Sequence, residues 1–175
     1  MLSVVIATHD SERALLPTLA ALVSGAAAGI VREVIVADAG SRDATTAIAD
    51  GAGCRVLISA QGRGVRLKAA ADAARASWLL FLRPGVVLDA TWVDETRRFV
   101  EQAELSGCAG THAAVFRASA FRPGLLEALA LLGTALGGHR DVEEPERDLR
   151  RRLRRRHLVL LRTGAILAGS SKLLD

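Results

Sequence analysis

Aromatic residues are scarce in this 175-residue chain, since 3% of its residues are aromatic and none of them is Tyr. Proteins that bind sugars or single-stranded nucleic acid by stacking need aromatic side chains as platforms. The composition therefore disfavours a lectin or a single-strand RNA-binding protein. Cysteine is also rare, because Cys54 and Cys108 stand alone and lack metal-ligand spacing. We expect both to be reduced packing residues of a cytosolic protein.

Long apolar runs are missing as well. Charged residues such as Arg83, Glu127 and Arg162 keep every apolar run below the roughly 18 residues of a membrane span. Met1 leads directly into an apolar segment without a basic n-region, so we expect no signal peptide and a cytoplasmic protein. Lys and Arg outnumber Asp and Glu by 23 to 19, an excess that suits anionic ligands without indicating nucleic acid.

Short β-branched runs alternate with helical segments along the first 105 residues. The predicted strands cover residues 2–8, 33–37, 55–58 and 78–82. The predicted helices cover residues 17–24, 44–51, 65–76 and 91–105, the second with Asp43 as its N-cap. Repeated strand–helix units with right-handed crossovers predict an α/β fold, a doubly wound and mostly parallel sheet with helices on both faces.

The remainder of the chain has a less regular pattern. Residues 111–117 and 158–161 are predicted strands, and residues 123–136 and 145–156 are predicted helices. We find no internal repeat, linker or low-complexity tail. A single domain over residues 1–175 is the simplest organisation.

The segment from Glu33 to Thr45 carries the strongest functional signal. A buried strand ends in Asp38, a tight turn with Gly40 and Ser41 follows, and Asp43 opens the next helix. This order predicts a carboxylate, a hydroxyl and open backbone N–H groups at the carboxyl edge of a parallel sheet, where nucleotides bind. A second interpretation also stays open, in which Asp43 serves only as a helix cap.

Five blocks of sequence occur in an order that is typical of one enzyme family. They are residues 3–10, 33–45, 62–68, 78–82 and 137–153. Four of them resemble the motifs S-V-V-I-P-T-x-N, E-V-I-V-V-D-x-G-S-x-D-x-T, G-R-x-x-Q-x-N-x-G and G-G-[FY]-x-D…E-D-x-D-L-x-x-R-L, and residues 78–82 resemble the strand before the family's metal motif. Together they resemble glycosyltransferase family 2, and its small bacterial subgroup with the G-R-x-x-Q block in particular.

The resemblance implies a Rossmann-like GT-A fold and transfer of a sugar from a nucleotide-sugar donor to an acceptor hydroxyl. Residues 1–105 would form the nucleotide-binding half, and residues 106–175 a shortened acceptor-side half. In the donor site, Asp38 would accept hydrogen bonds from the base or ribose, and Arg63 and Lys68 would reach the diphosphate. The full set of implied donor-binding residues is Thr8, His9, Asp10, Asp38, Gly40, Ser41, Arg63, Lys68 and Arg83.

The family usually carries a D-x-D motif whose oxygen ligands hold Mg²⁺ or Mn²⁺ after the fourth strand. Here Arg83, Pro84 and Gly85 stand at those positions, so these metal ligands are absent, and Asp89 is too far along the chain to substitute. Three interpretations stay open. Arg83 replaces the metal as a bidentate phosphate partner, the site has decayed in a non-catalytic relative that binds a nucleotide or a protein, or Arg83 simply ends a strand.

On the acceptor side, Glu146 falls where the family has its catalytic Asp, and Asp148 is the alternative base. A carboxylate within hydrogen-bond reach of the acceptor hydroxyl can act as the general base. Both residues are equally explained as acids that stabilise the first turn of a helix. The basic segment Arg147–Arg156 is either a solvated helix face or a peripheral contact with anionic lipid at the inner face of a membrane.

Overall fold

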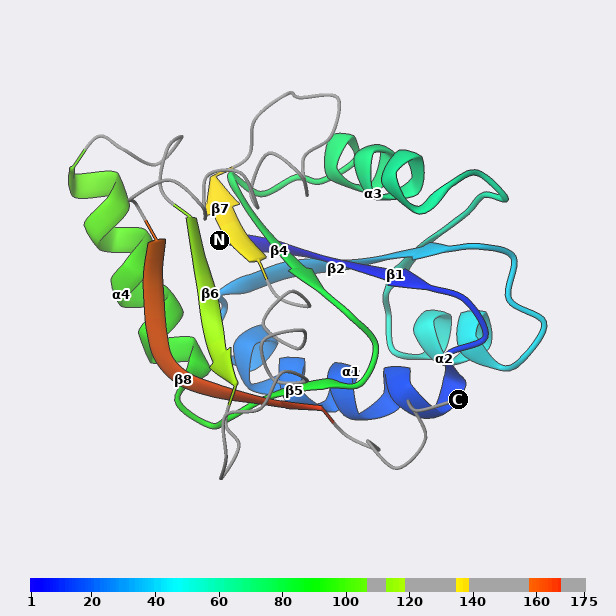
Figure 1. The fold of residues 1–175 in the computed structure, drawn as a ribbon, viewed down its shortest axis with the longest axis horizontal. Coiled ribbons are helices and arrows are strands. Elements are labelled where there is room, and N and C mark those ends of the chain that lie inside the picture. The colour runs from blue at the N-terminus through cyan, green and yellow to red at the C-terminus, as the bar shows by residue number, and fades with distance from the viewer. Residues whose placement is uncertain (107–112, 119–134, 139–157, 168–175) are drawn as a thin grey trace.

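Short aliphatic runs form the strands of this protein, and longer amphipathic segments form its helices. The computed structural model describes residues 1–106, 113–118, 135–138 and 158–167 (Figure 1). The strands are β1 (Leu2–Thr8), β2 (Val31–Asp38), β3 (Arg55–Ile58), β4 (Trp78–Leu82), β5 (Val86–Leu88), β6 (Ala113–Ala118), β7 (Ala135–Gly138) and β8 (Leu158–Leu167). The helices are α1 (Glu12–Ala27), α2 (Thr45–Gly51), α3 (Arg63–Asp72) and α4 (Trp92–Leu105).

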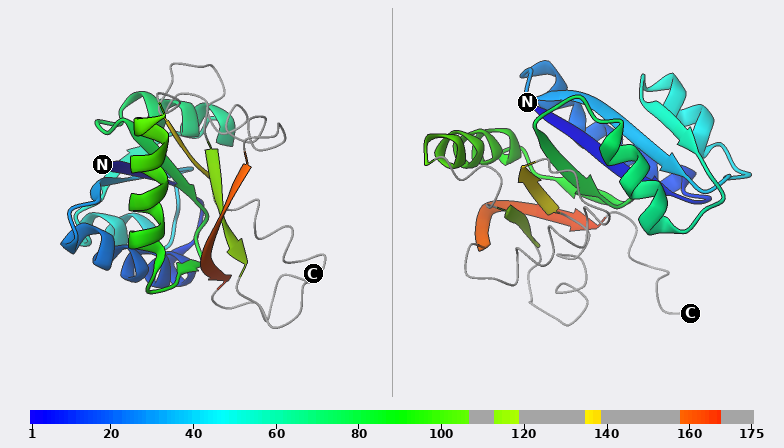
Figure 2. Two further views of the ribbon diagram at one scale, coloured as in Figure 1. Left: turned by 90° about the vertical axis from the view of Figure 1, so that its left-hand side faces the viewer. Right: turned by 90° about the horizontal axis from the view of Figure 1, so that it is seen from above.

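The strands form one eight-stranded sheet in the order β3-β2-β1-β4-β7-β6-β8-β5. β1 pairs in parallel with β2 and β4, and β2 pairs in parallel with β3. Antiparallel pairing enters at β7 and β5, whereas β6 and β8 are parallel neighbours (Figure 2). The predicted α/β fold with a mostly parallel sheet is confirmed.

Alternate residues of the central strands supply two cores, one on each face of the sheet. On one face, Ile6 shares a buried cluster with Leu15 of α1 and Trp92 of α4. On the other face, Val5 shares a second cluster with Leu67 of α3. In Figure 1, α1 and α2 accordingly lie on one side of the sheet and α3 lies on the other. Because helices cover both faces, ligands have access to the sheet at the carboxyl ends of its strands.

The start of α1 differs from the prediction. The helix begins at Glu12, and the Leu15 N–H donates to the Ser11 carbonyl at 2.8 Å, so Pro17 lies inside the helix instead of in its first turn. The proline removes one backbone donor, yet the helix continues through it because its buried face packs on the sheet. The predicted start at residue 17 is therefore wrong.

Two short strands were not expected from the pattern. β5 follows the predicted turn at Pro84 and Gly85, and β7 overlaps the last two residues of the helix predicted over residues 123–136. Leu136 pairs with Leu80 of β4, so pairing with a distant strand overrides the local helical pattern there. The rest of that predicted helix lies outside the described residues.

α2 begins at Thr45, and its N-cap residue is Ala44 instead of the predicted Asp43. The other boundaries agree more closely with the sequence. The strands predicted over residues 2–8, 55–58 and 78–82 are confirmed, and α4 ends at Leu105 as expected. α3 begins at Arg63, earlier than the predicted residue 65, with Gly62 as its N-cap. The last strand runs beyond residue 161 to Leu167 because it pairs with both β6 and β5.

Candidate functional site

The carboxyl ends of β1, β2 and β4 meet at one edge of the sheet. Thr8 of β1 is paired with Asp38 of β2, and Ile6 of β1 is paired with Leu82 of β4. Arg83 directly follows Leu82, the last residue of β4, so it lies at the same edge of the sheet as Thr8 and Asp38, the last residues of β1 and β2. The structure thus brings three predicted site residues from different parts of the sequence to the edge where α/β sheets bind ligands.

The Asp38 carboxylate is the centre of a hydrogen-bond network at this edge. Its Oδ1 accepts the backbone N–H groups of Gly40 at 2.8 Å and Ser41 at 2.6 Å. Its Oδ2 accepts the hydroxyl groups of Thr8 at 2.7 Å and Ser41 at 2.5 Å. Burial opposes ionisation of this carboxyl group, but the four hydrogen bonds prevail and hold the pKa of Asp38 below its usual value.

This network corrects the expectation that the Asp38 carboxylate faces a ligand. The residue has 0% solvent exposure, and Thr8 is nearly as buried at 2%. Donors of the protein itself occupy both carboxylate oxygens. In this structure Asp38 shapes the turn that follows β2.

The expectation that the turn keeps open backbone N–H groups is also wrong. The Gly40 and Ser41 N–H groups donate to Asp38, as described above, and the Arg42 N–H donates to Oδ1 of Asp10 at 2.8 Å. The Thr45 N–H at the start of α2 donates to Oδ1 of Asp43 at 2.9 Å. Carboxylates of the chain therefore take the place that an anionic ligand would have at this helix start. Charge on a ligand would have to be met by basic side chains.

His9 and Asp10 form the exposed part of the loop after β1. Asp10 has a φ of 44°, a left-handed conformation that Asp adopts more readily than most residues. Its N–H donates to the Ser41 hydroxyl at 2.9 Å, which ties this loop to the turn after β2. The His9 Nε2 lies 3.8 Å from Oδ2 of Asp10, and their side chains are 66% and 48% exposed. Both residues are accessible to a ligand.

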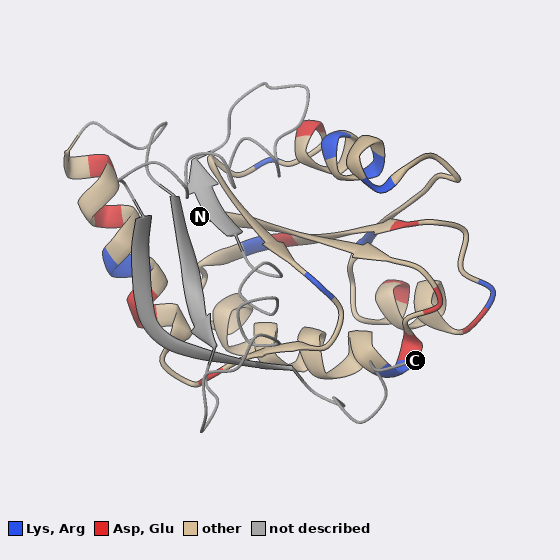
Figure 3. Ribbon diagram, viewed as in Figure 1, with Lys and Arg blue, Asp and Glu red and all other residues tan. Residues whose placement is uncertain are grey.

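The predicted phosphate-binding residues of α3 occupy its first two turns. Arg63 is exposed at the start of the helix. The Lys68 Nζ lies 2.9 Å from Oδ2 of Asp72, an i,i+4 ion pair on the helix surface. Figure 3 shows basic positions on α3 and in the connection that follows β4. An ion pair this exposed is weak, so a phosphate can compete with Asp72 for the Lys68 ammonium group.

The turn at Arg83–Gly85, where the resemblance places the metal motif, is anchored to α1. The Gly85 N–H donates to the Ala14 carbonyl at 2.8 Å and to the Thr18 hydroxyl at 2.9 Å. The Arg83 side chain is exposed beside this fixed turn. A guanidinium is a cation itself and gives no oxygen ligand, so the residues at this turn do not fit a divalent metal. Within the described ranges, no group of three or more His, Cys, Asp or Glu is placed to hold a metal ion.

Asp89, the nearest acidic residue after this turn, has a structural role. Its Oδ1 accepts the backbone N–H and the hydroxyl of Thr91, both at 2.8 Å, just before α4 begins.

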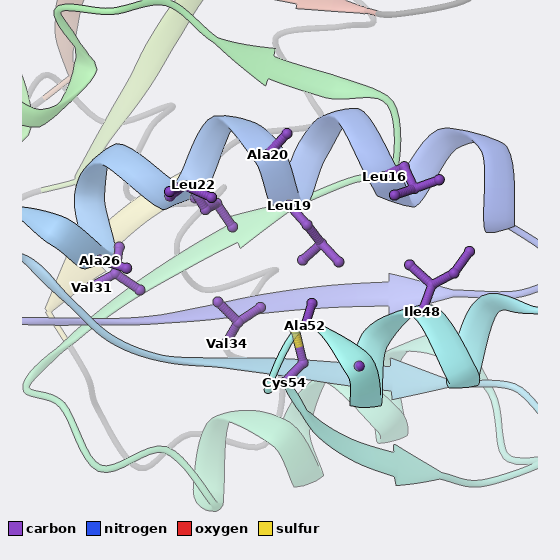
Figure 4. Close-up of a pocket in the computed structure, with 12 residues that line it drawn as sticks. Leu16, Leu19, Ala20, Leu22, Ala26, Val31, Val34, Ile48, Ala52 and Cys54 are labelled. Carbon is purple, nitrogen blue, oxygen red and sulfur yellow. The ribbon is translucent and has the colours of Figure 1, made fainter.

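A groove of about 550 Å³ lies elsewhere, between α1, α2 and β2 (Figure 4). Its lining is almost entirely apolar and consists of Leu16, Leu19, Ala20, Leu22, Val23, Ala26, Val31, Val34, Ile48, Gly51, Ala52 and Cys54. Burial raises the pKa of the Cys54 thiol. None of the predicted donor-binding residues lines this groove, so it is distinct from the candidate site.

Several predicted residues cannot be placed at the site. The predicted bases Glu146 and Asp148 and the basic segment Arg147–Arg156 lie outside the described residues. None of the helices α1 to α4 has the length and apolar character of a membrane span.

Two residues near the site, Glu12 and Thr45, were not predicted from the sequence. The Glu12 Oε2 accepts the Ala44 N–H at 3.1 Å, and the Thr45 hydroxyl accepts the Ser11 N–H at 2.7 Å. Glu12 occupies the first turn of α1, where an acid is favoured by the helix dipole. That position was the available signal, and the late predicted start of α1 concealed it.

Comparison with known proteins identifies the family. Residues 3–165 match the sequence profile of Glycosyl transferase family 2. The chain therefore belongs to this glycosyltransferase family, and the resemblance found in the sequence is confirmed. No curated protein matches the chain in sequence.

Solved structures show the same fold at low sequence identity. S. aureus TarS 1–349 superposes with a TM-score of 0.69 and 14% identity over 95% of this chain and 60% of that one. A TarS 1–349 complex with UDP superposes with a TM-score of 0.58 and 18% identity over 71% of this chain and 37% of that one. Glucosyl-3-phosphoglycerate synthase from Mycobacterium tuberculosis, in complex with Mn²⁺, UDP and phosphoglyceric acid, superposes with a TM-score of 0.56 and 20% identity. The match covers 79% of this chain and 56% of that one. The chain thus spans less than two thirds of each of these proteins.

Proposed function

We propose that this chain binds a nucleoside diphosphate sugar at the carboxyl edge of β1, β2 and β4 and transfers the sugar to an acceptor hydroxyl. The observation that carries the proposal is the ordered turn around Asp38 at that edge, formed by the segment from Glu33 to Thr45 that resembles a motif of the family. Membership of the family and the fold shared with UDP-bound and UDP-sugar-bound structures support a nucleotide-sugar donor.

For an inverting transfer, the acceptor oxygen attacks the anomeric carbon while the bond from that carbon to the diphosphate breaks. Glu146 takes the proton of the acceptor hydroxyl, and the nucleoside diphosphate leaves with the electron pair. The leaving group carries increased negative charge, which fixed cations stabilise in the transition state. Arg83, Arg63 and Lys68 are the basic residues that we assign to this role.

The transfer that we propose does not depend on a metal. Arg83 stands on an anchored turn at the position of the family's metal motif, and its planar guanidinium matches the geometry of phosphate. The backbone N–H groups after β2 are occupied by carboxylates, which leaves the diphosphate to side chains such as this one.

A second candidate function is nucleotide binding without catalysis. The same arginine at the metal position favours it, because loss of the D-x-D motif also fits a family member that no longer catalyses transfer. The two candidates share the nucleotide site and differ in the role of Glu146.

An assay of donor turnover separates these candidates. Wild-type protein is incubated with UDP-sugars and GDP-sugars in EDTA, where water takes the place of the acceptor hydroxyl, and the nucleoside diphosphate released by hydrolysis of the donor is measured. We expect release that falls by about 100-fold or more in Glu146→Gln, as loss of a general base predicts. Glu143→Gln, a neighbouring acid with no assigned role, is the matched control and should keep wild-type turnover. Binding of UDP without any turnover would instead support the non-catalytic function.

We also propose a peripheral membrane contact through the segment Arg147–Arg156, because clustered arginines attract anionic headgroups. Sedimentation with liposomes tests it. Binding should rise with the content of anionic lipid and disappear at high salt, since salt screens such attraction. Equal sedimentation with neutral and anionic liposomes would exclude this contact.

A further inference from the structure

We infer that Asp43 is a positioning residue, which holds the loops after β1 and β2 in the arrangement that receives the nucleotide. The inference rests on the proposed function, since it concerns the same edge of the sheet. It assigns to Asp43 more than the capping of one helix. The basis is a set of hydrogen bonds that run in both directions between the two loops.

The Asp43 carboxylate binds the first turns of two helices at once. Its Oδ1 accepts the backbone N–H of Thr45 at 2.9 Å, and also the Thr45 hydroxyl, at the start of α2. Its Oδ2 accepts the backbone N–H of Glu12 at 3.0 Å, at the start of α1. Each oxygen thus serves a different helix, so a side chain with a single acceptor cannot replace this carboxylate.

Carboxylates after β1 in turn accept hydrogen bonds from the backbone after β2. The Ala44 N–H donates to Oε2 of Glu12 at 3.1 Å, and the Arg42 N–H donates to Oδ1 of Asp10 at 2.8 Å. The two loops therefore exchange carboxylate acceptors and backbone donors. We use the name loop clasp for the carboxylates of Asp10, Glu12 and Asp43 together with the backbone N–H groups that donate hydrogen bonds to them.

The electrostatics of both helices favour the loop clasp. The N-terminus of a helix carries partial positive charge, and Glu12 and Asp43 place negative charge beside the starts of α1 and α2. These hydrogen bonds also favour the ionised carboxylate, and despite some desolvation the pKa of Asp43 lies below its usual value. The carboxylate is therefore ionised near neutral pH, the state in which both of its oxygens accept hydrogen bonds.

The loop clasp bears on ligand binding through the residues that it holds. Asp10 and Ser41 lie within the two joined loops, and the Ser41 hydroxyl connects the Asp10 N–H with the Asp38 carboxylate. A loop that is already ordered before binding does not lose that entropy when the ligand arrives. Cutting the link between α1 and α2 should therefore weaken nucleotide binding even where the cap of α2 is retained.

A pair of substitutions separates positioning from capping. Asp43→Ser keeps a short side-chain oxygen, which can cap the Thr45 N–H but does not also reach Glu12. Asp43→Ala removes both contacts. Asp50→Asn, which changes an exposed acid of α2 away from the candidate site, is the matched control.

The experiment is calorimetric titration of each variant with UDP, at a temperature where thermal unfolding shows that the variant is folded. We expect Asp43→Ser and Asp43→Ala both to bind UDP about tenfold or more weakly than wild type, because loops that are no longer joined lose conformational freedom when UDP binds. Asp50→Asn should bind within about twofold of wild type. Amide hydrogen exchange at Glu12 and Ala44, measured without ligand, should become faster in both Asp43 variants.

Three results would overturn the inference. Wild-type affinity in Asp43→Ser combined with weaker binding in Asp43→Ala would show that Asp43 only caps α2. Wild-type affinity in both variants would show that it has no role in binding. Absence of UDP binding by wild-type protein would overturn the proposed function itself, and with it any role for Asp43 in binding UDP, which distinguishes that failure from the other two.

Discussion

The Thr8 hydroxyl donates a 2.7 Å hydrogen bond to the Asp38 carboxylate and joins the ends of β1 and β2, where these two residues are register partners. The carboxylate accepts further hydrogen bonds from Gly40 and Ser41, and it is fully buried. An ion buried in this way is tolerated because each of its oxygens has donors. The stability of the site therefore depends on this one carboxylate.

Replacement of Asp38 by Ala should lower the free energy of unfolding by about 3 kcal/mol, because buried donors would lose their acceptor. Urea denaturation of the two proteins measures the difference. Asp50→Ala, at an exposed position of α2, serves as the control and should change stability by less than about 0.5 kcal/mol. A loss below about 1 kcal/mol in Asp38→Ala would contradict this role of the carboxylate.

Acid should weaken the same network. The pKa of Asp38 is lower in the folded chain than its usual value, so its contribution to stability is fully present above the unfolded pKa of about 3.9. That contribution is lost as the pH falls through the folded pKa. We expect urea midpoints measured between pH 6 and pH 3 to fall more steeply in wild type than in Asp38→Asn, which has no carboxylate to protonate. Parallel pH profiles would contradict the assignment.

Gly25 lies against the ring of Trp92, and this contact leaves no room for a side chain. A Cβ atom added to Gly25 would lie 2.3 Å from Cη2 of the Trp92 ring and 2.9 Å from Cγ2 of Val31. Gly25→Ala should therefore destabilise the protein by about 1–3 kcal/mol, although Ala favours a helix over Gly by about 1 kcal/mol.

Gly64→Ala is the matched control for the Gly25 substitution. Gly64 lies in α3, and an added Cβ there meets nothing within 4 Å. This variant should be as stable as wild type or up to about 1 kcal/mol more stable, as measured by thermal unfolding. Equal effects of the two substitutions would show that the Trp92 contact does not constrain α1.

The sequence predicted the central strands well, because apolar β-branched runs between turn residues leave few alternatives. It did not predict β7, whose residues have no strand pattern of their own and are defined by pairing with β4. The start of α1 was predicted too late, because proline is most common in the first turn of a helix. Packing of α1 on the sheet allows Pro17 to lie inside the helix instead. Local pattern was insufficient wherever a distant contact determined the structure.

The candidate site shows the same division. The position of Asp38 at the end of a strand was readable from the sequence, and the structure confirms that position. The burial and internal hydrogen bonding of its carboxylate could not be predicted, since one of its partners is Thr8, which is 30 residues earlier in the chain. The bond from Glu12 to Asp43 spans 31 residues and was equally hidden. The chemistry of single residues was visible in the sequence, and their partners required the fold.

The central claim is a nucleotide site at this sheet edge in which Arg83 supplies the positive charge. Titration of the wild-type chain with UDP in EDTA, followed by the same titration of Arg83→Ala, tests it most directly, with the exposed Arg98→Ala of α4 as the control. We predict that wild type and Arg98→Ala bind UDP in EDTA and that Arg83→Ala binds at least about tenfold more weakly, the loss expected for one charge-assisted phosphate contact. Equal affinity of Arg83→Ala and wild type, or no binding of UDP by wild type, would contradict the claim.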